Sequence, residues 1–113
     1  MSDGTIDAAT FAELQESAGT DFVKELVQTF LEEAPAMLAE LREALAAGNA
    51  DAFRRAAHSL KSNSLTFGAL PLGVLARELE LGGFDAARRS NALDALETEY
   101  TRAAQALEAL CRG

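Results

Sequence analysis

The chain has 113 residues, the size of one domain, and 49% of them are hydrophobic, enough for a single core without disulfides or metals. Its 18 acidic and 10 basic residues give a formal net charge of −8, which disfavours DNA or RNA binding. One cysteine excludes an intramolecular disulfide, and one histidine excludes a multi-histidine metal site. The sequence shows neither a signal peptide nor an apolar run of the ~18 residues that span a bilayer. We therefore expect a soluble, cytoplasmic, monomeric protein with one domain over residues 1–113.

Alanine, leucine and glutamate are abundant and there are only two prolines, so the chain favours helix. The first predicted helix covers residues 7–17, with Asp7 as its N-cap and Gly19 beyond its end. We expect this short helix to cap one end of the fold.

The second predicted helix covers residues 20–47, with Thr20 as its cap and Gly48 at its end. Apolar residues recur every three or four positions on both sides of Pro35, which predicts a kink and not a break. This apolar stripe consists of Phe22, Val23, Leu26, Val27, Phe30, Leu31, Ala34, Met37, Leu38, Leu41 and Leu45.

The third helix is predicted over residues 50–66, after Asn49 as its cap and before Gly68, and the fourth begins near Leu70 and Pro71. The short connections between these helices predict that neighbours run antiparallel.

Gly82 and Gly83 break the chain, and Asp85 can cap a final helix that reaches about Leu110. The predicted fold is all-α: an antiparallel up-down-up-down four-helix bundle with a short N-terminal capping helix. The seam of the final helix consists of Leu93, Leu96, Tyr100, Ala103, Leu107 and Leu110.

The third helix carries the only histidine of the chain, His58. At about 100° per residue, its apolar residues share one side of the helix and His58 falls on the opposite side. Three of the ten cations and a small hydroxyl residue lie within about one turn of His58, namely Arg54, Arg55, Lys61 and Ser62. The sequence therefore predicts an exposed imidazole in a basic island of an acidic chain.

This basic island suits a bound or transferring phosphoryl group. Cations neutralise the charge of that group, and the Lys61 ammonium or the Ser62 hydroxyl can donate hydrogen bonds to it. Helical geometry alone favours another interpretation, a solvated polar face on which a histidine happens to lie.

Glu80 is a candidate partner for the imidazole. If the third and fourth helices form a hairpin that turns near Ala69, His58 lies eleven residues before the turn and Glu80 eleven residues after it. Glu80 could then accept the Nδ1–H of His58 and leave Nε2 free as a nucleophile. An ordinary surface carboxylate is an equally compatible interpretation.

The segment of residues 57–69 resembles the signature of histidine-containing phosphotransfer (HPt) domains. In that signature a leucine follows the histidine by two residues, a lysine by three, a small residue by four, and glycine and alanine by ten and eleven. The resemblance covers roughly residues 6–110.

The resemblance implies that His58 accepts a phosphoryl group, most simply on Nε2, from the phospho-aspartate of a response-regulator receiver domain and passes it to another receiver. Lys61 would contact the phosphoryl group. Ser62 would leave room for the receiver at a position where the family often has glycine, and Glu80 matches a position where the family commonly has Gln or Glu.

Phosphoryl transfer requires a divalent cation, and the sequence shows no carboxylate cluster that must hold Mg²⁺ and no nucleotide-binding loop. We therefore expect a phosphocarrier and not an enzyme, without a metal or cofactor of its own, and place the Mg²⁺ site in the receiver partner. The expected partners are response-regulator receiver domains, with a hybrid histidine kinase as a further candidate. No nucleic-acid or membrane partner is expected.

Leu65 lies on the His58 side of its helix without a core role, and it is the predicted contact for a partner. Phe11, Phe22 and Val23 could border the same patch, although a core position is favoured for Phe22 and Val23. Two alternative functions stay open, a non-catalytic helical adaptor and a receiver-sequestering module. A di-iron bundle enzyme is excluded, because no glutamate precedes His58 by three residues.

Overall fold

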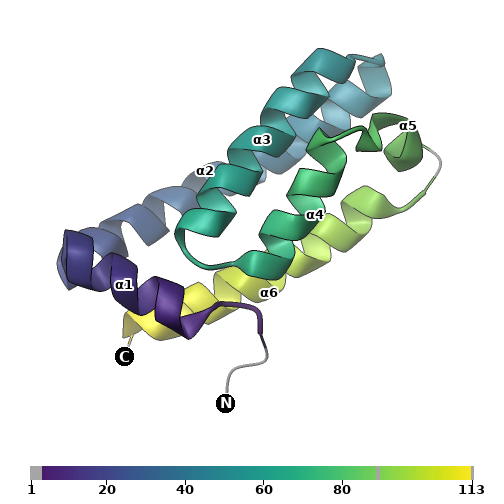
Figure 1. Ribbon diagram of the computed structural model, residues 1–113. Coiled ribbons are helices and arrows are strands. Elements are labelled where there is room, and N and C mark those ends of the chain that lie inside the picture. Colours follow the sequence, from purple (N-terminus) through teal and green to yellow (C-terminus); the bar gives the residue numbers. More distant parts are fainter. Residues whose placement is uncertain (1–3, 89, 113) are drawn as a thin grey trace.

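The computed structural model describes residues 4–88 and 90–112, and every regular element in these ranges is a helix (Figure 1). The protein is therefore all-α, as predicted. The helices are α1 (Ala8–Ala18), α2 (Thr20–Ala47), α3 (Ala50–Thr66), α4 (Leu70–Glu80), α5 (Gly83–Arg88) and α6 (Ala92–Arg112). α3 packs against both α2 and α4, and α6 packs against the same two helices.

One continuous core joins these helices. Side chains from every one of them contribute to it, and the largest fully buried apolar residues are Val23, Leu41, Phe53, Leu60, Leu72, Leu96 and Leu107. Burial of each such side chain contributes about 1.5–3 kcal/mol. Because α2, α3, α4 and α6 all supply them, the core fixes α3 relative to its neighbours and so fixes the direction of its outer face.

α2 continues through Pro35 without a break, as predicted. Proline has no backbone N–H, so the carbonyl of Leu31 loses its usual partner four residues later. The Tyr100 hydroxyl of α6 donates a long hydrogen bond of 3.4 Å to this carbonyl. A side chain from a neighbouring helix thus compensates for the proline.

Two predicted helix boundaries were wrong. Thr20 is already helical, and the cap of α2 is Gly19, whose φ of 94° suits glycine. The predicted final helix from Asp85 is divided into α5 and α6, and Asp85 lies inside α5 instead of capping a helix. α6 starts after Asn91, whose carbonyl accepts a hydrogen bond of 3.1 Å from the backbone N–H of Ala95. Leu110, assigned to the seam, is 41% exposed.

α1 lies across the end of the fold where α3 turns into α4 (Figure 1). Phe11 of α1 is buried, and the backbone N–H of Asp7 donates a 2.7 Å hydrogen bond to the carbonyl of Gly68 in the turn. Gly68 has a φ of 80°, and a Cβ atom there would lie 2.9 Å from the Asp7 carbonyl oxygen. The turn therefore needs glycine both for its backbone conformation and for the close approach of α1.

Candidate functional site

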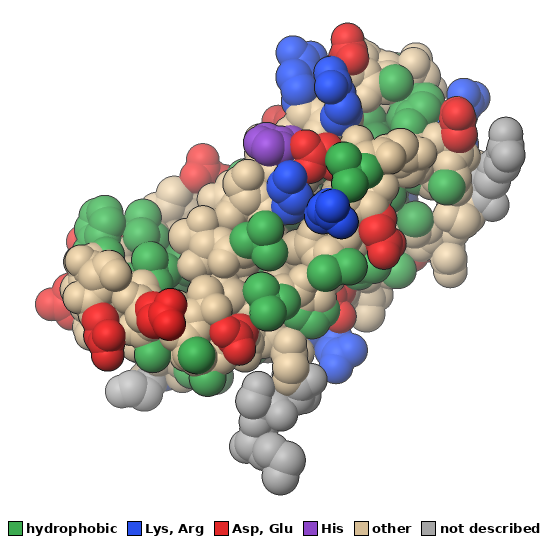
Figure 2. Space-filling view, viewed as in Figure 1, with side chains coloured by type: hydrophobic (Ala, Val, Ile, Leu, Met, Phe, Trp, Pro, Cys, Tyr) green, Lys and Arg blue, Asp and Glu red, His purple; other side chains and the backbone are tan. Residues whose placement is uncertain are grey.

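α3 separates its core residues from its polar residues cleanly. Its buried residues are Phe53, Ala56, Ala57, Leu60 and Ser64. Ser64, the polar member, donates its hydroxyl to the carbonyl of Leu60 at 2.7 Å. His58 lies on the opposite side, and 57% of its side chain is exposed. Figure 2 shows the imidazole at the surface, next to Lys and Arg side chains.

The hairpin of α3 and α4 brings three charged or titratable side chains together. The Nδ1 atom of His58 lies 2.7 Å from Oε2 of Glu80, and the Nζ atom of Lys61 lies 2.7 Å from Oε1 of the same carboxylate. Only 15% of the Glu80 side chain and 21% of the Lys61 side chain are exposed. A carboxylate acceptor at Nδ1 assigns the ring proton to that nitrogen, so Nε2 carries the lone pair.

Glu80 is held in its ionised form. The hydrogen bond from Lys61 lowers the pKa of the Glu80 carboxyl below its ordinary value, the hydrogen bond from His58 lowers it further, and burial opposes both to a smaller extent. The carboxylate is therefore charged at neutral pH and orients the imidazole.

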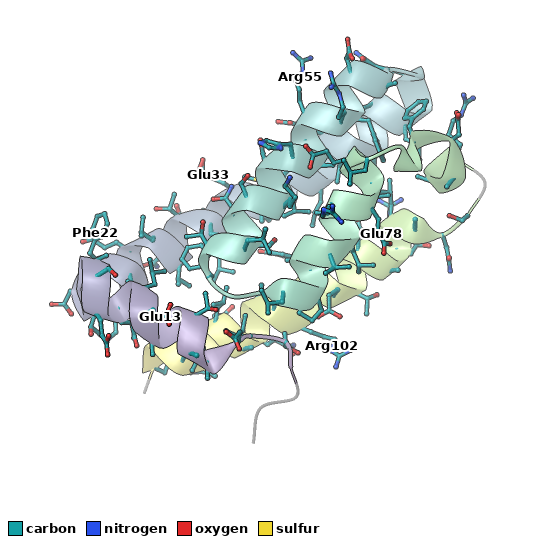
Figure 3. The ribbon with its side chains drawn as sticks, in the orientation of Figure 1. Glu13, Phe22, Glu33, Arg55, Glu78 and Arg102 are labelled. Atoms are coloured by element: carbon teal, nitrogen blue, oxygen red, sulfur yellow. The ribbon has the colours of Figure 1, made fainter. Side chains whose placement is uncertain are left out.

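A hollow of about 450 Å³ adjoins the imidazole and is lined by Arg54, Arg55, His58, Ser59 and Glu80. Arg54 forms an exposed ion pair of 3.3 Å with Asp51. Figure 3 labels Arg55, which projects from the outer side of α3 toward solvent. The hollow offers two guanidinium groups and the imidazole to an anionic group.

Ser62 and Leu65 lie one and two turns beyond His58 and are both exposed. Leu65, 43% exposed, leans over α4, where a Cβ atom on Gly73 would stand only 2.7 Å from its Cδ2 atom. The predicted contact residue is thus at the surface, on the α4 side of the site.

Of the three residues that could border an apolar patch, Phe11 and Val23 are buried and only Phe22 is exposed. Phe11 and Val23 are 3% and 0% exposed, because both pack into the core. Phe22 is 51% exposed and belongs to the first turn of α2, next to α1 (Figure 3).

Sequence reasoning missed two features of the site. Ser59 lines the hollow. The only sequence signal for this role was its position next to His58. The ion pair between Lys61 and Glu80 was also missed, and a signal for it existed. Lys61 and His58 are three residues apart on α3, so a carboxylate level with one of them is also within a turn of the other.

Among the described residues, no group of three or more His, Cys, Asp or Glu side chains is arranged to hold a metal ion. Within the same ranges, no helix is both long and apolar enough to cross a bilayer.

Comparison with known proteins agrees with this geometry. Residues 25–112 match the Hpt domain family, and the chain therefore belongs to that family. α1 and the first turn of α2 precede the matched range.

Among solved structures, the chain is similar to histidine-containing phosphotransfer protein B (HptB) from Pseudomonas aeruginosa PAO1, with 29% sequence identity and a TM-score of 0.86. The similarity covers 98% of this chain and 97% of the other. The chain matched none of the curated proteins with which it was compared.

Proposed function

We propose that this protein is a histidine phosphotransfer protein of a phosphorelay, in which His58 accepts a phosphoryl group from the phospho-aspartate of a receiver domain and passes it to another receiver. The observation that carries the proposal is the exposed imidazole whose Nδ1 atom lies 2.7 Å from the Glu80 carboxylate. Membership of the Hpt family and the similarity to a phosphotransfer protein support it.

The chemistry follows from the tautomer. The lone pair of Nε2 attacks the phosphorus, an N–P bond forms, and the P–O bond to the receiver aspartate breaks with release of its carboxylate. The Nδ1 proton stays on the ring, and no proton has to leave. The ring gains positive charge as the bond forms, and the Glu80 carboxylate stabilises that charge at Nδ1. Attack by an aspartate of a second receiver reverses each of these changes.

The cations beside His58 act on the phosphoryl oxygens. Arg54 and Arg55 line the hollow at the imidazole and neutralise the charge of the incoming group. Lys61 is paired with Glu80 in the unphosphorylated protein, and its four-carbon stem lets the ammonium turn toward a phosphoryl group on Nε2. The small side chain of Ser62 leaves room for the receiver.

The protein acts as a phosphocarrier in this proposal. Members of the Hpt family are carriers and not classical enzymes. The transition state of phosphoryl transfer needs a divalent cation, and we place that Mg²⁺ in the receiver. We also infer that α2, α3, α4 and α6 form an antiparallel four-helix bundle, because each of the short loops between α2, α3 and α4 reverses the chain.

Transfer of radioactive phosphate from a panel of phosphorylated receiver domains tests the function. The wild-type protein should gain acid-labile, base-stable label, and the His58→Gln variant should gain none while unfolding at the same urea concentration. A protein that binds receivers but never gains label would instead be an adaptor or a sequestering module. Label retained by His58→Gln would contradict the assignment of His58.

A further inference from the structure

The hollow beside the imidazole and the lysine of the site belong to different parts of α3. Besides His58, the hollow is lined by Arg54, Arg55, Ser59 and Glu80. Lys61 and Ser62 follow about one turn after the histidine and do not line the hollow. The cations near His58 therefore form two groups, the two arginines of the hollow and Lys61.

Lys61 already has a partner that it cannot leave without cost. Its Nζ atom lies 2.7 Å from Oε1 of Glu80, and this oxygen is buried. If the ammonium stayed on a phosphoryl group at His58, the Oε1 atom would be left buried and unpaired, beside a second negative charge. An unpaired buried carboxylate oxygen is strongly unfavourable. Lys61 should therefore return to Glu80 whenever no receiver is bound.

The two arginines of the hollow are available to an anion. Arg55 forms no ion pair or hydrogen bond with the residues that the structure describes. Arg54 pairs with Asp51 at 3.3 Å, and 62% and 82% of these two side chains are exposed. Such an exposed pair contributes little and exchanges readily for the stronger, charge-assisted contact with a phosphoryl group.

The hydroxyl of Ser59 is also available. The later polar side chains of α3 donate to backbone carbonyls four residues before them, at 2.7–2.9 Å, and these donors are Asn63, Ser64 and Thr66. The Ser59 hydroxyl has no such bond to any described residue, and it lines the hollow. It can therefore donate a hydrogen bond to an anionic group held there.

We propose that the phosphoryl group of phosphorylated His58 rests in a site of three residues, Arg54, Arg55 and Ser59, when no receiver is bound. Lys61 contacts the group during transfer and otherwise stays on its carboxylate partner. The N–P bond stays intact, and rotation about it turns the phosphoryl oxygens toward the two guanidinium groups and the hydroxyl. This resting site stabilises the phosphorylated protein relative to the phosphorylated receiver, and the proposal rests on the proposed function.

The equilibrium of transfer tests the resting site. Forward and reverse rates are measured with the first receiver in the panel that labels the wild-type protein, and their ratio gives the equilibrium constant. The double variant Arg55→Gln, Ser59→Ala should shift this constant toward the receiver by at least about fivefold. Lys61→Ala should slow both directions alike and leave the constant unchanged.

Arg112→Gln is the matched control for the loss of one positive charge. Arg112 is exposed at the end of α6 and does not line the hollow at His58, so this variant should keep the wild-type equilibrium constant. Arg55 and Ser59 are exposed as well, and the double variant and the control should unfold at the urea concentration of the wild type.

NMR of the unaltered protein gives an independent measurement. Phosphorylation should shift the side-chain ¹⁵N signals of Arg54 and Arg55 and leave the ammonium signal of Lys61 in place. An unchanged equilibrium constant in the double variant, an equal shift in Arg112→Gln, or a shifted Lys61 signal with unshifted arginines would overturn the resting site and leave the function intact. If no receiver labels the wild type, the proposed function fails, and this inference fails with it.

Discussion

At the scale of single residues, the site depends on one carboxylate that serves two partners. Glu80 accepts a hydrogen bond from His58 and forms an ion pair with Lys61, each at 2.7 Å. The negative charge of the Glu80 carboxylate favours the ring proton at Nδ1 of His58. Lys61 keeps this carboxylate ionised because it lowers the pKa of Glu80. The same residue therefore links the reactivity of the imidazole to the stability of the hairpin.

The pKa of Glu80 gives a prediction on stability. Because its pKa is lowered in the folded protein, Glu80 stabilises the fold fully above its ordinary value and loses this contribution as the pH falls through the folded value. Glu80→Gln should be less stable than the wild type at neutral pH, and the difference should narrow as the pH falls below the ordinary pKa of the Glu80 carboxyl. Urea unfolding of both proteins across this range measures it. A difference that stays constant with pH would show that the charge of Glu80 contributes nothing.

Lys61 gives a prediction on rate. Lys61→Ala removes a cation that holds Glu80 and can reach the phosphoryl group, so transfer from a receiver should slow about tenfold, which corresponds to ~1.4 kcal/mol in the barrier. The free energy of unfolding should change by less than about 1 kcal/mol. Lys24, the other lysine of the chain, is the matched control, and Lys24→Ala should transfer at the wild-type rate. Normal transfer in Lys61→Ala would remove this lysine from the mechanism.

At the scale of elements, the turn between α3 and α4 sets the level of Glu80 relative to His58. Gly68 in this turn has a positive φ and contacts α1, whereas Gly48 between α2 and α3 has a positive φ of 72° in open space. A side chain at Gly48 would therefore meet backbone strain alone, whereas a side chain at Gly68 would meet both backbone strain and a steric clash.

Alanine substitutions at the two glycines should therefore differ. Gly48→Ala should cost about 1 kcal/mol from strain alone. Gly68→Ala should cost at least about 2 kcal/mol, because strain adds to the clash with the Asp7 carbonyl oxygen at 2.9 Å. Thermal or urea unfolding of both variants measures the two costs. Equal losses of stability in the two variants would mean that the close contact between α1 and Gly68 does not contribute to the free energy of unfolding.

The contact between α2 and α6 near Pro35 gives a prediction on the stability of Tyr100 variants. Tyr100→Phe should lose about 0.5–1 kcal/mol of stability, because the Leu31 carbonyl loses its hydroxyl partner. Tyr100→Leu should lose more, since it also removes the edge-to-face packing on Phe30, whose ring centroid lies 6.1 Å away. A Tyr100→Phe protein as stable as the wild type would show that water satisfies this carbonyl equally well.

Helix existence and core faces could be predicted from the sequence because periodicity and capping residues are local signals. The bounds of α3 and the exposure of His58 follow from Asn49, Gly68 and a spacing of 100° per residue. The division between α5 and α6 was missed because the apolar seam begins only at Leu93 and gives no signal for the residues before it. The position of Phe22 was missed for a different reason, since exposure at a helix end depends on neighbouring helices that periodicity does not place.

At the scale of the whole molecule, a chain with a net charge of −8 carries its reactive imidazole beside a cluster of cations. The core orients α3, the turn at Gly68 sets α4, and the two helices together place Glu80 behind His58. The fold thus leaves one nitrogen, Nε2, open to a partner. Phosphoryl transfer through Nε2 of His58 alone is what this arrangement predicts.

NMR of the phosphorylated protein, with ¹⁵N in the histidine ring, tests this claim most directly. We expect one phosphohistidine, with coupling of ³¹P to Nε2 of His58 and the proton retained on Nδ1. Phosphate on Nδ1, or on a residue other than His58, would contradict the account.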